Sequence, residues 1–246
     1  MITKSEIKYI QSLAHKKFRE EETCFVVEGI KMVDELITNF PQLVLSVYVT
    51  ADGMIQISKK LPKNITCVEV QDHELKKISF LTTPHEILAL VKMPSFEKKE
   101  KLDKGLTLLL DQIQDPGNLG TIIRTSDWFG VKNIVCSPDT ADAFSPKVIQ
   151  ASMGSILRVH VEYEDLGGYL DRLHNTPVYA ATLKGESMLE LNFALPSCLI
   201  IGNESKGISD SLLARATRFI SIPKLGDAES LNAAVATGVL LSRLLS

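Results

Sequence analysis

The sequence predicts an α/β fold whose second half contains a parallel sheet. From residue 106 onwards, short apolar segments of strand length alternate with segments of helical spacing, the pattern of a sheet covered by helices. The segment Leu106–Leu110 is apolar almost throughout, as expected for a strand at the centre of such a sheet. Three later apolar segments, 178–183, 198–201 and 219–222, each run into a polar loop that contains glycine.

The length and composition are compatible with two domains. The chain has 246 residues, of which 45% are hydrophobic, enough to form a substantial core. Residues 94–104 are charged, almost free of apolar side chains and flanked by proline and glycine, which is typical of an exposed linker. We therefore expect a first domain over residues 1–93 and a second over residues 105–246.

The first domain is expected to be a small α/β unit, because strands and helices alternate along it. A helix is predicted over residues 5–18 and another after Gly29, and Asp72 is expected to cap a third, short helix through its carboxylate. The predicted strands are 25–27, 43–50, 65–70 and 86–92.

The second domain is expected to place its most informative helix directly after its first strand. Asn118 is suited to cap a helix over 119–129, and Arg124 lies off the apolar face of that helix. The residues predicted to share this face are Leu119, Ile122, Ile123 and Ser126. Further strands are predicted at 134–137 and 158–163, and further helices after Ser145-Pro146, at 169–173 and at 212–216.

The final helix, predicted over 229–245, is apolar on almost every side. A helix of this kind must be buried on all sides. Two arrangements satisfy this requirement: burial against a second copy of the chain, or burial between two layers of its own domain.

The composition argues against several classes of protein. A net charge of −3 and a pI of about 6.0 disfavour a broad basic face. The four cysteines show no paired spacing and mostly sit in apolar segments, which favours buried thiols in a reducing compartment. Metal-ligand spacing, a dinucleotide-binding fingerprint and a phosphate-binding loop are not found in the sequence. Without an apolar leader or an apolar run of transmembrane length, we expect a soluble cytoplasmic protein.

The three glycine-bearing loops indicate a ligand site. In α/β sheets ligands bind beyond the carboxyl ends of the strands, and glycine lets the backbone approach a ligand closely. Ordinary strand-to-helix turns would look similar one at a time. Three of them in one domain predict a pocket large enough for an adenosine group.

Three segments together carry a family resemblance. Residues 118–126 (Asn-Leu-Gly-Thr-Ile-Ile-Arg-Thr-Ser), 199–208 and 222–236 resemble the three motifs of the SpoU (TrmH) family of RNA ribose 2′-O-methyltransferases. The resemblance implies that the second domain is a parallel-sheet SPOUT methyltransferase domain with a trefoil knot, which the rules of chain connection would not predict. It also implies an RNA-binding first domain like ribosomal protein L30e, and residues 25–33 resemble the start of that domain.

The same resemblance implies an activity. It is methyl transfer from S-adenosylmethionine to a ribose 2′-hydroxyl of structured RNA (rRNA or tRNA), carried out by a homodimer joined through the C-terminal domain and without a metal. A non-catalytic RNA-binding protein on the same scaffold is the alternative. The cluster Lys16, Lys17 and Arg19 is then either a solvated helix end or a contact to RNA phosphates.

Site residues carry over by their place in the motifs. The resemblance implies that Arg124 is catalytic, with support from Asn118 and Glu204, either as the group that activates the hydroxyl or as a clamp on the neighbouring phosphate. The residues expected to contact the cofactor are Gly202, Ile222 and Leu231, with Thr182, Leu183 and Asn232 in addition. Ala234 stands where the family commonly has serine, which leaves the role of that hydroxyl unfilled in this chain.

Overall fold

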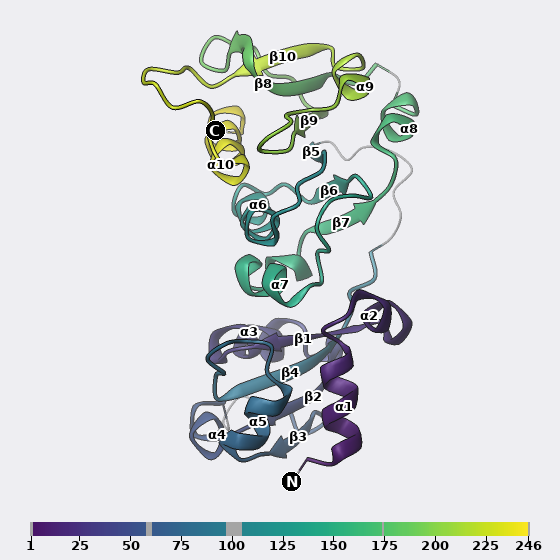
Figure 1. The fold of residues 1–246 in the computed structure, drawn as a ribbon, viewed down its shortest axis with the longest axis vertical. Helices are drawn as coiled ribbons and strands as arrows, with labels where there is room; N and C mark the ends of the chain where they lie inside the picture. The colour runs from purple at the N-terminus through teal and green to yellow at the C-terminus, as the bar shows by residue number, and fades with distance from the viewer. Residues whose placement is uncertain (1, 58–60, 97–104, 174, 246) are drawn as a thin grey trace. The chain divides into compact units, whose positions relative to one another are not determined.

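The computed structural model describes residues 2–57, 61–96, 105–173 and 175–245 (Figure 1). Two compact units are distinguished by their internal contacts. Unit 1 comprises Met1–Ser95 and Phe144–Gly154, and unit 2 comprises Phe96–Ala143 and Ser155–Ser246. Most of the predicted linker, 97–104, lies outside the described residues. The domain boundaries inferred from the sequence stay a prediction.

Unit 1 is built on a mixed sheet that has four strands within the described part of the chain. These are β1 (Cys24–Glu28), β2 (Val44–Val49), β3 (Thr66–Glu69) and β4 (Ile87–Lys92), in the order β1-β4-β2-β3. Only β2 and β3 are parallel to each other. The helices of unit 1 are α1 (Lys4–Ser12), α2 (Lys16–Glu22), α3 (Ile30–Asn39), α4 (Ala51–Ile57), α5 (Asp72–Ile78) and α7 (Pro146–Ser152), with a 3₁₀ turn η1 at Pro41–Leu43.

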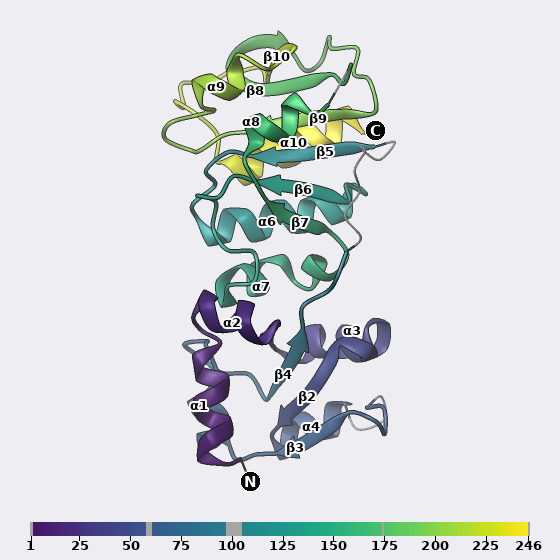
Figure 2. The same cartoon turned by 90° about the vertical axis from the view of Figure 1, so that its right-hand side faces the viewer.

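Both faces of this sheet are covered by helices (Figure 2). Leu88 and Leu90 of β4 pack in one cluster with Ile10 of α1 and Leu75 of α5. The alternate residues of β4, such as Ala89, are also buried, and they point to the opposite face because side chains alternate along a strand. There α3 packs on β1 and β4, and α4 packs on β2. This unit is therefore a three-layer α/β sandwich.

The N-terminal helix departs from its prediction. Residues 5–18 form no single helix: α1 ends at Ser12 and α2 begins at Lys16. Arg19 explains the break, because its buried guanidinium donates to the Leu13 carbonyl at 2.6 Å and satisfies the end of α1. Lys16 and Lys17 each lie within an ion pair to a glutamate one turn on, at 3.7 and 3.8 Å. The structure thus favours the helix-end interpretation of this basic cluster.

One expectation for unit 1 is wrong, and one helix of unit 1 was not predicted. Asp72 does not cap α5: the cap is Gln71, whose backbone N–H donates to Glu74 at 2.9 Å in a capping box, and Asp72 is the first helical residue. The helix α4 was not predicted, because its short segment offers little helical periodicity.

Unit 2 contains the predicted parallel sheet, which has six strands within the described ranges. They are β5 (Leu106–Leu110), β6 (Asn133–Cys136), β7 (His160–Tyr163), β8 (Val178–Ser187), β9 (Ser197–Ile201) and β10 (Arg218–Ser221), in the order β10-β8-β9-β5-β6-β7. All pairings are parallel. All five residues of β5 are buried, as expected of a strand between two others.

Helices cover both faces of this sheet as well (Figures 1 and 2). The helices α6 (Pro116–Trp128) and α10 (Ala233–Leu244) lie together on one face, and α8 (Leu166–Asp171) and α9 (Asp210–Leu213) lie on the other, with a 3₁₀ turn η2 at Ser155–Leu157. The predicted inward face of α6 is confirmed, since Leu119, Ile122, Ile123 and Ser126 are all buried.

The start of α6 differs from the prediction. Asp115 is the cap, and its carboxylate accepts the Asn118 N–H at 2.8 Å. Pro116 in the first turn has the fixed φ that suits this position. Asn118 is therefore inside the helix rather than at its cap, which leaves its side-chain amide available for other partners.

The final helix is shorter than expected and begins at Ala233. Its cap is Asn232, whose Oδ1 accepts the backbone N–H groups of Ala234 and Val235 at 2.9 and 3.2 Å. Leu240, Leu241 and Leu244 are buried, whereas Val235 is 52% exposed. Within this one chain the helix is thus buried on one side only.

The structure also bears on the cysteines, on membrane-spanning helices and on metal-ligand clusters. Cys24, Cys136 and Cys198 are buried, Cys67 is half-buried, and all four thiols are free. No helix within the described residues is long and apolar enough to cross a membrane. Within the same residues no cluster of potential metal ligands is found.

Candidate active site

The predicted cofactor residues follow strands that are neighbours in the sheet. β10, β8 and β9 are adjacent and parallel, so their carboxyl ends lie at one edge. Gly202 follows β9 and Ile222 follows β10. Thr182 and Leu183 belong to the irregular middle of β8. The sheet therefore delivers four of the predicted residues to the same edge.

β8 is longer than the predicted segment 178–183, because the strand is interrupted there and then resumes. It pairs with β9 through residues 178–180, and its pairing with β10 jumps from Ala180 to Glu186, so that 181–185 pair with neither neighbour. Gly185 is required where the chain returns to β10, since a Cβ there would lie 2.7 Å from the Phe219 carbonyl. The excursion leaves Leu183 73% exposed.

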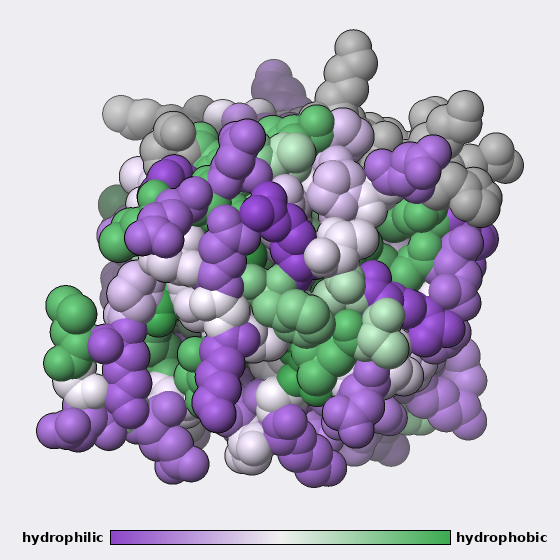
Figure 3. Space-filling view, turned by 90° about the horizontal axis from the view of Figure 1, so that it is seen from above, coloured by the Kyte–Doolittle hydropathy of each residue, from purple (hydrophilic) through white to green (hydrophobic). Residues whose placement is uncertain are grey.

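The segment from β8 to the loop after β10 carries much of the exposed apolar surface of unit 2. The exposed large hydrophobic residues between β8 and the loop after β10 are Leu183, Leu189, Leu195, Phe219 and Leu225. Figure 3 is seen from above, over β8 and β10 as Figure 1 labels them, and hydrophobic residues show between hydrophilic ones on that face. Such surface is suited to an apolar ring system or another apolar partner.

The loop after β9 is held by its own side chains. A Cβ at Gly202 would lie 2.5 Å from the Gly207 carbonyl oxygen, so only glycine fits there. Asn203 accepts the N–H groups of Ser205 and Lys206 at 2.9 and 3.1 Å through Oδ1. Its Nδ2 donates to the carbonyl of Gln112 at 2.8 Å, which ties this loop to the exit of β5.

Sequence analysis missed these supporting residues. Asn203 offers a signal, because asparagine commonly bonds the backbone two residues on. Gln112 offers none: its φ of +57° is unusual for a residue other than glycine. Asp111 is buried and accepts the Ser209 N–H at 2.7 Å, another tie between the same two segments.

Three side chains from the three motifs meet in one hydrogen-bond network. The Asn118 amide donates to the Glu204 carboxylate. Its Oδ1 accepts from Asn232 Nδ2 at 2.8 Å. Since Asn232 also caps α10, the network joins the first turn of α6, the loop after β9 and the start of the last helix. Leu231, next to Asn232, is 46% exposed beside this network.

The carboxylate in this network is paired with a neutral group. Glu204 is half-buried and has no ion pair to any described residue. No cationic side chain of the described residues therefore neutralises its charge, which makes this edge of the sheet attractive to a positively charged ligand group.

Arg124 stands apart from the network. It lies about two turns along α6 from Asn118 and is exposed, and its side chain has no hydrogen bond or ion pair with the described residues. The structure does not bring Arg124 and Glu204 into an ion pair, so Glu204 does not orient the guanidinium in this chain. A free, fully charged guanidinium is suited to bind a phosphate in a bidentate manner.

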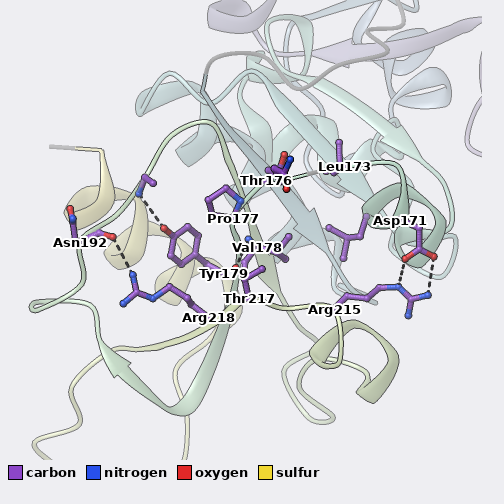
Figure 4. A pocket seen from close by; sticks show the side chains of 13 residues that line it. Asp171, Leu173, Thr176, Pro177, Val178, Tyr179, Asn192, Arg215, Thr217 and Arg218 are labelled. Carbon is purple, nitrogen blue, oxygen red and sulfur yellow. Dashed lines mark hydrogen bonds and ion pairs between the residues drawn. The ribbon is translucent and has the colours of Figure 1, made fainter.

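A different hollow lies at the opposite, amino end of the strands (Figure 4). It measures about 800 Å³, and its lining includes Val178 at the start of β8, Thr217, and the side chains of Arg215 and Arg218. Arg215 is held by Asp171. None of the predicted cofactor residues lines this hollow.

Comparison with known proteins gives these features a context. The model of the SpoU rRNA Methylase family matches residues 105–242, more than half of the chain. The chain belongs to this family. A second model, the MRM3-like substrate binding domain, matches residues 4–89. Membership confirms the identification made from the three motifs, and with it the enzyme class, an RNA methyltransferase.

Individual relatives agree over nearly the whole length. The chain is 34% identical to the 23S rRNA (guanosine(2553)-2′-O)-methyltransferase of Bacillus subtilis over 97% of this chain and 95% of that protein. A Porphyromonas gingivalis protein described as an RNA methyltransferase of the TrmH family is 39% identical, with a TM-score of 0.86 over 99% of this chain and 98% of that one. The AdoMet-bound rRNA methyltransferase from Sinorhizobium meliloti is 26% identical, with a TM-score of 0.82 over 99% and 95%.

Proposed function

We propose that this enzyme transfers the methyl group of S-adenosylmethionine to a ribose 2′-hydroxyl of ribosomal RNA. The observation that carries the proposal is the network of Asn118, Glu204 and Asn232, which gathers one polar residue from each motif at the carboxyl edge of the sheet. The similarity to rRNA 2′-O-methyltransferases favours ribosomal over transfer RNA as the substrate.

The residues at this edge fit the methyl donor. S-adenosylmethionine supplies a methyl group already activated on a cationic sulfonium. The uncompensated carboxylate of Glu204 suits that positive charge. Leu183 and Leu231, exposed by 73% and 46%, provide apolar contacts for the adenosine. The backbone at Gly202 and Ile222, with Thr182 and Asn232, supplies the polar contacts.

Arg124 is the residue that we assign to the RNA. A guanidinium stays protonated in proteins and is a poor base. We therefore assign it to clamping the phosphate next to the target ribose and to stabilising the alkoxide that develops as the hydroxyl loses its proton. Glu204, as the carboxylate of the network, is the candidate acceptor for that proton.

Some features rest on family membership and on exposure. We propose a homodimer joined through the exposed side of α10, where Val235 is 52% exposed. The trefoil knot, the likeness of the first domain to ribosomal protein L30e and the cytoplasmic location are further parts of the proposal. They add no residue to the chemistry above.

The decisive experiment compares the 2′-O-methyl positions of total RNA from cells with and without the gene. Loss of one rRNA methylation, restored by the wild-type gene and not by Arg124→Ala, is the expected result. Restoration by Arg215→Ala, at the other end of the sheet, is the matched control. Calorimetry with S-adenosylmethionine tests the alternative: absence of binding together with unchanged methylation would indicate a non-catalytic RNA-binding protein.

A further inference from the structure

The single tryptophan of the chain lies on the exposed side of α6. Trp128 is 84% exposed, and it has no ring or cation–π contact with the described residues. Thr121 and Arg124 are exposed along the same helix, whereas Ile122 and Ile123 on the opposite side are buried. An indole so far from any packing partner is unusual, because burial of a tryptophan is normally favourable.

The position of Trp128 relative to Arg124 is fixed by helical geometry. Residues four apart are neighbours on a helix surface, with about 5–6 Å between their Cβ atoms. Helical side chains lean towards the N-terminus, so the indole lies over the turn that carries Arg124. A group bound by the guanidinium therefore has the indole face within reach.

This pair of side chains matches the two recognisable parts of a nucleotide. Guanidinium groups bind phosphate, and exposed aromatic rings stack on the unpaired bases through which proteins recognise RNA. We propose that Trp128 is a stacking platform for a base of the RNA substrate, beside the phosphate held by Arg124. The inference rests on the proposed function, and it adds a positioning residue that the motifs do not contain.

The surroundings favour RNA over a second copy of the chain. No other large hydrophobic residue of α6 is exposed, so the indole does not belong to an apolar patch on this helix. Beyond the helix, Lys132 is 58% exposed and lies 3.9 Å from Asp127, which also binds Arg158 at 2.7 Å. Residues 124–132 thus carry two cationic side chains, Arg124 and Lys132, and one anionic side chain, Asp127, a balance that complements a polyanion.

Because Trp128 is the only tryptophan, the intrinsic emission of the full-length protein reports on this one side chain. The probe is protein-free ribosomal RNA from cells that lack the gene, added to the wild-type protein. We expect quenching that saturates with RNA. A shift in emission that follows protein concentration and does not respond to RNA would overturn the inference and place the indole in a contact between two copies.

Methylation kinetics provide the second readout. Stacking of one base contributes about 1–3 kcal/mol, so Trp128→Ala should raise the KM for RNA by roughly 5- to 150-fold with little change in kcat. Trp128→Phe should retain most of the affinity, and both variants should bind S-adenosylmethionine normally. An unchanged KM in Trp128→Ala would contradict the proposal. RNA-dependent quenching in a wild-type protein that does not methylate would support stacking while refuting the proposed function.

Discussion

The two ends of the parallel sheet in unit 2 differ in whether their charged side chains form ion pairs with each other. At the amino end, Arg215 meets Asp171 through two hydrogen bonds of 2.8 and 3.0 Å. At the carboxyl end, the Glu204 carboxylate has no ion pair with the described residues, and the Arg124 guanidinium, further along α6, has no partner among them either.

This difference indicates which end is prepared for a ligand. At the amino end, the opposite charges pair with each other, so they attract a charged ligand only weakly. At the carboxyl end, the partner of Glu204 is the neutral amide of Asn118, so the carboxylate stays available to a ligand, as does the guanidinium of Arg124 on α6. Charged side chains without an ionic partner in the chain are expected where the charges serve binding or catalysis rather than stability.

The largest expected effect belongs to Arg124. Arg124→Ala should lower kcat by about 10²- to 10³-fold, the range seen when one donor to a developing oxyanion is removed. Arg124→Lys keeps the charge but loses the two-pronged geometry, so it should recover only part of the rate. Single-turnover methylation of rRNA measures both variants.

The matched control for the Arg124 variants is a variant of Arg215, at the amino end of the sheet. Arg215→Ala removes another exposed arginine of unit 2 and should leave the rate unchanged. Affinity for S-adenosylmethionine should be the same in all of these variants. If Arg124→Ala weakened cofactor binding as much as catalysis, the assignment of this residue to the RNA would be wrong.

A steric change at the loop after β9 should have the next largest effect. In Gly202→Ala the new methyl group would meet the backbone of Gly207 and Ile208, so one strand of the loop must move. We expect a loss of about 1–3 kcal/mol in the free energy of unfolding and weaker binding of S-adenosylmethionine. Denaturant titration and calorimetry measure the two effects.

The control for this change is Gly105→Ala, where no atom lies within 4 Å of the added carbon. It should leave the free energy of unfolding and the cofactor affinity nearly unchanged. Equal behaviour of the two alanine variants would show that the close approach of Gly202 to Gly207 is unimportant.

Much of this architecture could be predicted from the sequence, because it rests on periodicity. The central strand β5 and the inward face of α6 follow from apolar patterning. The three glycine loops belong to strands that are neighbours and parallel in the sheet. The cap of α6 was assigned to Asn118 instead of Asp115, since either residue suits that position and local propensity does not decide between them.

The arrangement within the site could not be predicted in the same way. The bond from Asn118 to Glu204 joins residues far apart in the chain, and it depends on which loops the sheet brings together. The same is true of Arg19, whose burial against the carbonyl of Leu13 depends on the break between α1 and α2. The sequence can identify candidate residues, but it does not show which residues they contact.

The hydrogen-bond network provides a test of moderate size. Asn118→Ala removes the partner of both Glu204 and Asn232, so its effect on kcat should overlap with those of Glu204→Gln and Asn232→Ala. Double variants with Asn118→Ala should therefore cost less than the sum of the single changes, by a coupling energy of about 0.5–3 kcal/mol. Strictly additive losses would mean that the three residues act independently and that the network has no common role.

The smallest expected effect lies at the amino end. The exposed pair of Asp171 and Arg215 contributes little to stability, because solvent screens it. The hydrogen bond from Arg215 lowers the pKa of Asp171 below its usual value of 3.8. A lowered pKa in the folded state means that the contribution of the pair is present above pH 3.8 and is lost as the pH falls through the folded-state value.

The Arg215→Ala variant should therefore melt slightly below the wild type at pH 7, with a difference in melting temperature that shrinks in high salt and in acid, while methylation is unaffected. A clear loss of methylation in this variant would show that the amino end of the sheet also takes part in binding RNA, and the contrast between the two ends would no longer hold.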